Sequence, residues 1–324
     1  MSLRPDWRPS ASLEVLRHRA RMLAAARACF AEAGVLEVET PLLSHAAVTD
    51  FHLESVPAEV AGQGRMYLHT SPEYPMKRLL AAGVGDCYQV CRVFRDGERG
   101  SNHNPEFTMI EWYRLDFDAE RLMDDVESLV RRMLSGLRQL PAAERVTYRE
   151  VVQELGGADP MTASADELAA ALRRHGISVP VSGLEDRDAL LDLLVSIAVG
   201  PRLGHDRPVF VHDYPASQAA LARIRAAEFP VAERFELYLD GLELANGFHE
   251  LADAREQRRR FEAELAARAA HARPPRPVDE PFLAALAHGL PDCSGVALGF
   301  DRLVMAACGL SSIDEALAFP VERA

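Results

Sequence analysis

The feature that most constrains the fold is the stretch 91–113, CRVFRDGERGSNHNPEFTMIEWY, in which two strand patterns flank a long polar loop. On both sides of the loop the residue types alternate with a period of two, which is typical of β-strands. The loop is too charged and too rich in Gly and Asn to pack in a core. It carries the donors Arg95, Arg99 and His103, and an aromatic residue, Phe107, follows. Such donors beside an aromatic face suit a triphosphate with a stackable base, and an ordinary exposed hairpin loop is the alternative.

Length and charge narrow the possibilities further. A chain of 324 residues can bury a substantial core as one large domain or two average ones. Its formal net charge of −13 describes a surface that repels polyanions such as tRNA. The five cysteines lack metal-finger spacing, the N-terminus has no apolar signal region, and no apolar run approaches the length of a membrane span. We therefore expect a soluble cytoplasmic protein with reduced cysteines, no membrane association and little tRNA binding.

Helical and strand patterns divide the rest of the chain. Apolar residues recur at helical spacing from Ser12, the expected N-cap, until Gly34. Strands are predicted over 35–40 and 66–70, and helices over 76–82, 118–137, 164–176 and 190–199. The last two helices lie in a segment, about 159–206, that carries no chemical constellation and is interpreted as a helical insertion.

A pair of carboxylates is expected next to a tight turn. Asp240-Gly241 is a strong signal for a two-residue β-hairpin. If the two residues that flank the turn are paired across the hairpin, Glu236 and Glu243 lie diagonally on one sheet face, about 7–8 Å apart. Two such carboxylates repel each other unless a cation lies between them, and Mg²⁺ accepts ligands from carboxylates and nucleotide phosphates. The alternative is that one of the two is merely exposed on an edge strand.

Three separated blocks resemble, in the family's order, the motifs of class II aminoacyl-tRNA synthetases, and of the lysyl-tRNA synthetase branch in particular. They are FR followed by HNPEFTMIEWY, similar to motif 2, LYLDGLELANGFHEL at 237–251, and GVALGFDRLVM at 295–305, similar to motif 3. The helix, strand and Pro41 near the N-terminus resemble motif 1, so the resemblance implies a homodimer. It also implies an α+β fold, in which an antiparallel β-sheet flanked by helices forms a single catalytic domain over 1–324.

Within that branch, four stretches closely match the stand-alone paralogues that ligate (R)-β-lysine to a lysine of elongation factor P. These stretches are HNPEFTMIEWYR, PASQA, ELANGFHELADAREQ and PDCSGVALG. The catalytic helix begins near Ser12, which leaves no room for the anticodon-binding domain of lysyl-tRNA synthetases. The resemblance therefore implies that ATP activates β-lysine as an adenylate and that elongation factor P, rather than tRNA, accepts it.

The resemblance also assigns roles to individual residues. Catalysis is expected from Arg95 at the α-phosphate and Arg302 at the outer phosphates, and Mg²⁺ binding from Glu236 and Glu243. ATP is expected to contact Arg95, Asp96, Gly97, His103, Asn104, Phe107, Glu243, Leu244, Gly299 and Arg302. The amino acid is expected to contact Ser71, Pro72, Glu73, Tyr113, Asn246, Phe248, Glu250 and Ala297. Arg302 falls in the first turn of a predicted helix, where its charge opposes the helix dipole unless an anion such as phosphate compensates it.

The amino-acid pocket raises a question of strand geometry. Glu250 with Tyr113 is expected to bind a terminal ammonium group, because a buried glutamate without a cation is costly. Strand parity nevertheless puts Asn246 and Glu250 on the face opposite Glu243. If all of them line one pocket, the strand must bulge at Gly247 or end there.

Two positions depart from lysyl-tRNA synthetases. The glutamate of the motif 2 Arg-x-Glu pattern is Gly97 here, so either Glu98 replaces it through a shifted loop or ATP binds more weakly. A glycine beside the amino-acid pocket is Ala297 here, and one added methyl group can discriminate between substrates by about 1–3 kcal/mol.

Three other functions fit parts of the sequence. The chain could be a truncated synthetase that activates α-lysine for another acceptor. It could be an amino-acid–ammonia ligase of the asparagine synthetase A type, although ELANGFHEL supplies an ammonium pocket that argues against this. It could also be an inactive regulatory paralogue, although such a protein would normally have lost Arg302 or a metal-binding glutamate.

Overall fold

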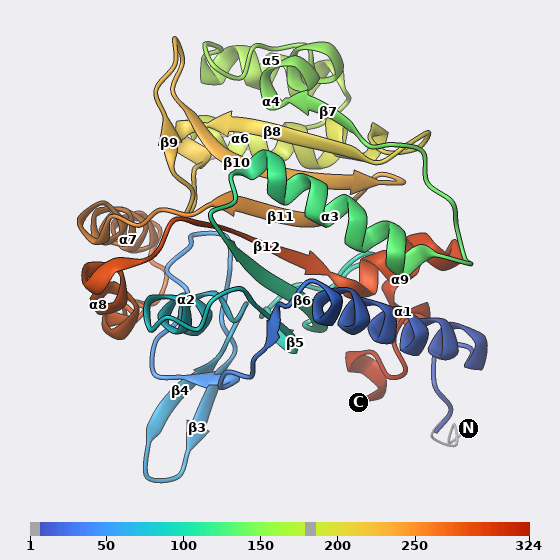
Figure 1. Cartoon of the computed structure of the whole chain (residues 1–324). Coiled ribbons are helices and arrows are strands. Elements are labelled where there is room, and N and C mark those ends of the chain that lie inside the picture. Colours follow the sequence, from blue (N-terminus) through green and yellow to red (C-terminus); the bar gives the residue numbers. More distant parts are fainter. Residues whose placement is uncertain (1–6, 179–185) are drawn as a thin grey trace, which may run out of the picture.

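The computed structural model describes residues 7–178 and 186–324. The part of the predicted insertion at 179–185 and the first residues of the chain, 1–6, lie outside the described residues. The strands of the main sheet are β1 (Leu36–Glu37), β5 (Cys87–Phe94), β6 (Glu106–Leu115), β7 (Glu144–Thr147), β8 (Val209–Pro215), β9 (Ile224–Arg225), β10 (Val231–Leu239), β11 (Leu242–His249) and β12 (Cys293–Gly299). Within the described residues they form one sheet in the order β1-β5-β6-β12-β11-β10-β8-β7, with β9 paired to β10 (Figure 1).

The predicted α+β fold is confirmed, and the sheet is mixed. Its centre, from β5 to β8, is antiparallel, whereas the edge strands β1 and β7 pair in parallel with β5 and β8. A parallel partner needs a long crossover connection instead of a tight turn. Both connections exist: the insertion joins β7 to β8, and the segment after β1 contains α2 (Glu73–Ala81) and a small sheet. The small sheet consists of β2 (Leu43–Ser44), β4 (Gly64–Leu68) and β3 (Pro57–Val60), in that order.

Two helices, α1 (Leu13–Glu32) and α3 (Ala119–Leu134), lie side by side across one face of the sheet (Figure 1). Ser12 caps α1 as predicted, because its hydroxyl oxygen accepts a hydrogen bond from a backbone N–H of the first turn. Beneath the helices, Phe30 stacks on Tyr88 of β5 with ring centroids 4.1 Å apart. These contacts belong to the largest hydrophobic cluster of the described residues, to which α9 (Phe300–Cys308) also contributes.

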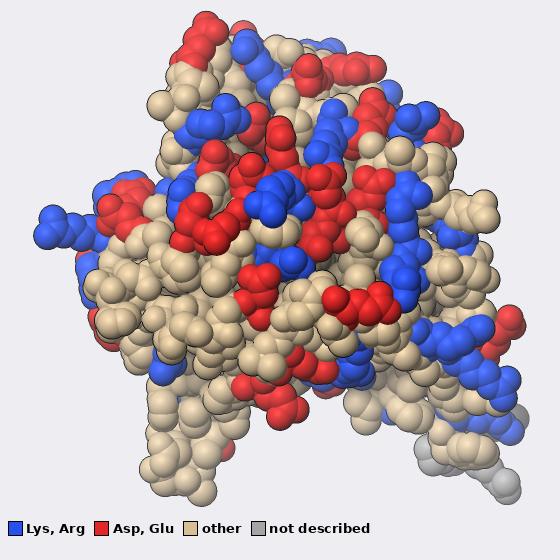
Figure 2. All heavy atoms as spheres, in the orientation of Figure 1, with Lys and Arg blue, Asp and Glu red and all other residues tan. Residues whose placement is uncertain are grey.

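Charges of both signs are interspersed on the outer surface of α3, on the face that Figure 2 shows. Arg131 pairs with Glu127 at 2.7 Å, and Arg145 of β7 pairs with Asp124 at 2.5 Å. The electrostatic field over this face is therefore of mixed sign, unlike the basic surface that a nucleic-acid-binding face usually presents.

Near one end of the sheet, α2 packs against α8 (Glu280–Gly289), which also packs against α7 (Ala254–Ala270) (Figure 1). Tyr74 of α2 stacks on Phe282 of α8 with ring centroids 4.7 Å apart. No helix of the described residues is both long and apolar enough to span a bilayer.

The helices of the insertion build a second hydrophobic cluster. They are α5 (Ala165–Arg174) and α6 (Arg187–Leu194), and α4 (Tyr148–Val151), which precedes the insertion, contributes to the same cluster. Ser164 and Glu167 form a capping box at the start of α5, and the helix predicted at 190–199 is α6 continued by a π-helical turn, Val195–Val199.

The two hydrophobic clusters lie on opposite faces of the same strands. Val209 and Val211 of β8 belong to the cluster of the insertion, whereas Phe210 belongs to the cluster beneath α1 and α3. Alternate residues of a strand point to opposite faces of the sheet, so one strand serves both cores. The insertion thus packs against the main sheet.

Candidate active site

A deep pocket of about 480 Å³ opens on the face of the sheet opposite α1 and α3. On β6, Met109, Glu111 and Tyr113 line this pocket, whereas the alternating Ile110 and Trp112 belong to the cluster beneath α1 and α3. Strands β10, β11 and β12 continue the floor of the pocket, and residues before and at the start of α2 contribute to its side.

The hairpin at Asp240-Gly241 is confirmed. Both turn residues have positive φ, 53° and 76°, as a tight two-residue turn requires, and Tyr238 pairs with Glu243 across it. The chain then bulges, because Leu237 pairs with Ala245. The bulge leaves one extra residue in β11.

That extra residue, Leu244, explains how residues on both sides of it can line one face of the sheet. The prediction of a bulge or a strand end at Gly247 is wrong, because Gly247 pairs regularly with Phe235 and β11 continues to His249. One added residue moves every later side chain to the other face. Asn246 therefore pairs with Glu236 and lies on the same face as Glu243.

At the end of the pocket where the amino acid is expected, which we call the amino-acid end, the buried Lys77 lies between two carboxylates. The Nζ of Lys77 is 2.6 Å from an oxygen of Glu73 and 2.6 Å from an oxygen of Glu250. The hydroxyl of Tyr113 donates to Glu111 at 2.7 Å, and the other oxygen of Glu111 has no hydrogen-bond partner among the described residues. The cation that we expected Glu250 to need is thus supplied by the chain itself, and the partner of Tyr113 is Glu111.

Lys77 and Glu111 are functional candidates that the sequence reasoning missed. Lys77 follows Glu73 by one helical turn, and Glu111 shares a strand face with Tyr113, so both could have been found from spacing. Burial raises the pKa of Glu111 to about 8, with Glu73 adding to the effect. Burial also raises the pKa of Glu250 to about 8, although Lys77 opposes the shift. One lysine facing three carboxylates leaves the pocket attractive to a further cation.

Two small residues of β12 shape the same end of the pocket. A Cβ added at Gly295 would lie 2.3 Å from the ring of Tyr113 and 2.5 Å from Glu250, so this position excludes a side chain. Ala297 pairs with Asn246 on one side and with Glu111 on the other, which puts its methyl group between one expected substrate contact and the newly found Glu111.

At the other end of the pocket, two arginines lie near the predicted phosphate positions. The guanidinium of Arg95 lies over the ring of Phe107 at 5.1 Å, and its buried Nε has no hydrogen-bond partner among the described residues. Arg302 donates to the backbone carbonyl of Glu243 at 2.9 Å and contacts His103 at 2.7 Å. Burial and the charge of Arg302 lower the pKa of His103, which favours the neutral imidazole.

The anion that the charge of Arg302 needs is supplied in part by the chain itself. The carboxylate of Glu243 lies 3.7 Å from Arg302, and the carbonyl of Asn102 accepts a hydrogen bond from it at 3.2 Å. These partners hold the guanidinium in place before any substrate binds.

The carboxylates of the predicted magnesium site have an arginine beside them. Glu236 accepts hydrogen bonds from Arg234 and from the hydroxyl of Tyr238, both at 2.6 Å. Burial and the nearby Glu236 raise the pKa of Glu243. The described residues contain no group of three or more His, Cys, Asp or Glu side chains placed to hold a metal ion. A pair of carboxylates on one sheet face has the ligand chemistry of a Mg²⁺ that takes its other ligands from phosphates and water. Sequence reasoning missed Arg234.

Most predicted site residues line the pocket, and three do not: Pro72, Asp96 and Gly97. Pro72 is the N-cap of α2, and Asp96 and Gly97 lie in an exposed turn whose glycine has a φ of 77°. Glu98 lines the pocket instead and lies 3.8 Å from Arg95. The structure thus favours Glu98 over Asp96 and Gly97 as the contact to a nucleotide.

Asn104 lines the pocket, but its side chain also holds the C-terminal segment. Its amide donates to the carbonyl of Glu106 at 2.7 Å and accepts from the backbone of Val321 at 3.1 Å.

Comparison with known proteins shows the family to which the chain is similar. Residues 5–323 match the tRNA synthetases class II (D, K and N) family. The chain is 49% identical over 329 aligned residues to proteins named elongation factor P--(R)-beta-lysine ligase from Salmonella gallinarum (strain 287/91 / NCTC 13346) and Salmonella paratyphi B (strain ATCC BAA-1250 / SPB7). Each alignment covers 100% of this chain and 100% of the relative.

Proposed function

The chain belongs to the class II tRNA synthetases and, within them, to the elongation factor P–(R)-β-lysine ligases, and from this membership we propose its reaction. It activates (R)-β-lysine with ATP and ligates the product to a lysine side chain of elongation factor P. A translation factor as the acceptor favours a cytoplasmic reaction, and the net charge of −13 favours a protein acceptor over tRNA.

The observation that carries this proposal is the charge of the amino-acid end. Glu73, Glu111 and Glu250 with Lys77 leave two negative charges when all four groups are ionised. A diamino acid brings two ammonium groups, which matches that charge, and the unpartnered oxygen of Glu111 is a ready acceptor for one of them. Phe248 lines the same pocket and suits the methylene stem.

Adenylate formation requires positioning and charge, not a side-chain nucleophile. A carboxylate oxygen of β-lysine attacks the α-phosphorus of ATP, and pyrophosphate leaves. Arg95 stabilises charge at the α-phosphate, while Arg302 and His103 hold the outer phosphates. Phe107 and an arginine enclose the adenine. In the second step the neutral amine of the acceptor lysine attacks the activated carbonyl, a proton is lost, and AMP leaves.

Glu236 and Glu243 would hold Mg²⁺ together with the phosphates of ATP. The bound ion would neutralise phosphate charge and so ease nucleophilic attack. The chain's own contribution is to keep two carboxylates on one sheet face, with Arg234 balancing their repulsion in the substrate-free protein.

The proposal treats the chain as one catalytic unit that forms a homodimer. The insertion shares β8 and β10 with the main core, which favours a single unit. The homodimer is supported by the resemblance of the N-terminal part to motif 1, in which Leu13 and Leu36 have exposed fractions of 66% and 53% and are thus accessible to a partner.

The test offers labelled (R)-β-lysine or α-lysine with ATP to purified elongation factor P and, separately, to total tRNA. We expect label on elongation factor P, more from β-lysine than from α-lysine, and negligible label on tRNA. Labelling of tRNA at a rate that rivals the protein acceptor would refute the proposal.

A further inference from the structure

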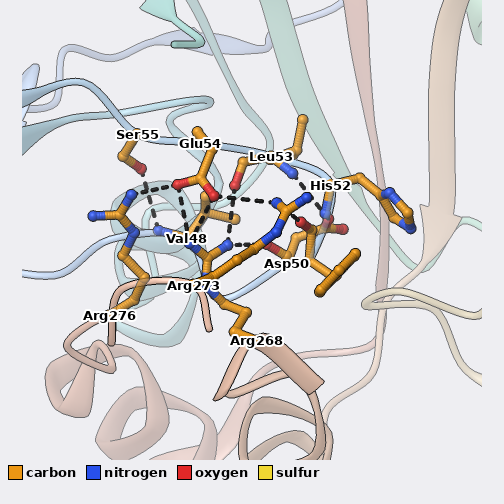
Figure 3. A network of polar contacts seen from close by, with 10 residues as sticks. Val48, Asp50, His52, Leu53, Glu54, Ser55, Arg268, Arg273 and Arg276 are labelled. Atoms are coloured by element: carbon orange, nitrogen blue, oxygen red, sulfur yellow. Dashed lines mark hydrogen bonds and ion pairs between the residues drawn. The ribbon is translucent and has the colours of Figure 1, made fainter. Parts of the chain in front are cut away.

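Beside the pocket, one carboxylate accepts hydrogen bonds from three arginines. The side chain of Glu54 accepts hydrogen bonds from Arg268 at 2.7 and 3.0 Å, from Arg273 at 3.2 Å and from Arg276 (Figure 3). The arginines come from the end of α7 and the chain that follows it. We call these four residues the Glu54 cluster. Arg268 has an exposed fraction of only 1%, and a buried charge of this kind needs a partner.

The same arginines also hold the backbone of the segment before Glu54. Arg268 donates to the carbonyl of Asp50 at 2.9 Å, and Arg273 donates to the carbonyl of Phe51. The guanidinium of Arg273 also lies 4.1 Å from the centre of the Phe51 ring. An irregular segment without strand or helix hydrogen bonds is thus fixed by side chains from residues more than 200 positions later.

This segment forms part of the pocket. Asp50, His52, Leu53 and Ser55 all line the cavity that contains the amino-acid end and the nucleotide end. None of the four cluster residues lines it. The cluster therefore stands behind the pocket lining and can affect a substrate only through the segment that it holds.

The backbone of Glu54 connects to the nucleotide end. Its carbonyl accepts a hydrogen bond from the N–H of Asp96 at 2.8 Å. Asp96 directly follows Arg95, the residue expected at the α-phosphate. Glu54 is thus bonded on one side to the arginines and on the other to the loop that carries Arg95.

We propose that Glu54 is a positioning residue that links the two substrate subsites. Its carboxylate fixes the segment 50–55 at the pocket, and its carbonyl fixes the start of the nucleotide loop, so binding of one substrate orders the contacts of the other. The proposal rests on the proposed adenylation reaction. The first ligand bears the entropic cost of ordering these contacts, and the second ligand then binds contacts that are already ordered. The result is positive coupling between the affinities of the two ligands.

The test measures the dissociation constant of β-lysine by calorimetry, with and without a non-hydrolysable ATP analogue, in the full chain. We expect the analogue to tighten β-lysine binding by about fivefold or more in the unaltered protein. In Glu54→Gln this ratio falls toward one, and kcat/KM in amino-acid-dependent ATP–pyrophosphate exchange falls by about tenfold to a hundredfold. Arg258→Gln is the matched control, because Arg258 lies on the same helix but pairs with the exposed Glu280.

A second pair of variants separates positioning from charge balance. Arg273→Gln, whose side chain is the most exposed of the three arginines at 34%, should reduce the coupling even if Glu54→Gln does not fold. The double variant Glu54→Gln/Arg273→Gln restores the net charge of the cluster, so we expect it to recover stability but not coupling. Unchanged coupling in a folded Glu54→Gln or Arg273→Gln, recovery of coupling in the double variant, or no coupling in the unaltered protein would overturn the inference. Absence of exchange in the unaltered protein would instead refute the proposed function.

Discussion

At the scale of single residues, the acidic end of the pocket sets how binding responds to pH. The pKa values of Glu111 and Glu250 are raised to about 8, so below that pH the free protein holds protons on these carboxylates. A substrate with two ammonium groups binds the ionised carboxylates and must release those protons.

We therefore expect the KM for β-lysine to fall as the pH rises from about 6.5 toward about 8, and the effect to be weaker in Glu111→Gln, which has one fewer proton to release. The measurement is the exchange rate at varied β-lysine and saturating ATP across this pH range. A KM that is flat or rises with pH would show that these carboxylates bind the substrate without changing protonation.

Contacts with Glu243 hold the guanidinium of Arg302 in place before substrate binds. Removing this side chain therefore tests how much a preorganised positive charge contributes to adenylation. We expect Arg302→Ala to lower the adenylation rate by roughly 10²–10³, as the loss of one preorganised donor does in other enzymes. Exchange kinetics and a thermal melt, with Arg258→Ala as a surface control, check this outcome. A folded variant with unaltered kinetics would remove Arg302 from the phosphate site.

The nucleotide loop offers a contrast between two neighbouring residues. Because Glu98 lines the pocket, we expect Glu98→Ala to raise the KM for ATP more than it changes kcat. Gly97→Glu, which restores the Arg-x-Glu spacing, should not improve ATP binding, because a φ of 77° strains any other residue by about 1–3 kcal/mol. Lower ATP affinity in Glu98→Ala together with a reduced Tm in Gly97→Glu is the expected pattern. Tighter ATP binding by Gly97→Glu would mean that the loop rearranges.

At the scale of elements, we propose that strand β12 controls which amino acid fits. We expect Ala297→Gly to relax the preference for β-lysine over α-lysine by about 1–3 kcal/mol, because the methyl group is removed beside Asn246 and Glu111. Two positions earlier on the same face, Gly295→Ala should abolish amino-acid binding, because its Cβ would displace Tyr113 and Glu250. Competition between the two isomers in the exchange assay measures both effects. Equal use of the isomers by the unaltered protein would exclude a role for Ala297.

The hairpin of β10 and β11 shows how one element decides the site. The extra residue at Leu244 brings Asn246 to the face that Glu236 and Glu243 already share. Without it, Asn246 would lie on the face of the sheet opposite Glu236 and Glu243.

At the scale of the whole molecule, the proposed homodimer is open to test. We expect Leu36→Glu to shift sedimentation from dimer to monomer while the far-ultraviolet circular dichroism stays unchanged, because a charge is placed in the proposed apolar interface. The control is Ile197→Glu in the insertion, where the exposed fraction of 50% is similar. An unaltered protein that sediments as a monomer would contradict the proposal directly.

The sequence by itself determined the features that depend on local pattern. The cap at Ser12, the capping box of α5 and the turn at Asp240-Gly241 all follow from residues within a few positions of one another. Each depends on hydrogen bonds or side-chain periodicity within one element, so a short window contains the whole physical cause.

Only the tertiary structure decided which groups meet across the chain. Lys77 of α2 meets Glu250, which is far away in the sequence, and Glu54 meets three arginines from the end of α7 and beyond. The bulge at Leu244 likewise depends on how β11 pairs with β10 on one side and β12 on the other. Burial makes these partners necessary, because a charge removed from water must find its counterion wherever the packing of helices and sheet provides one.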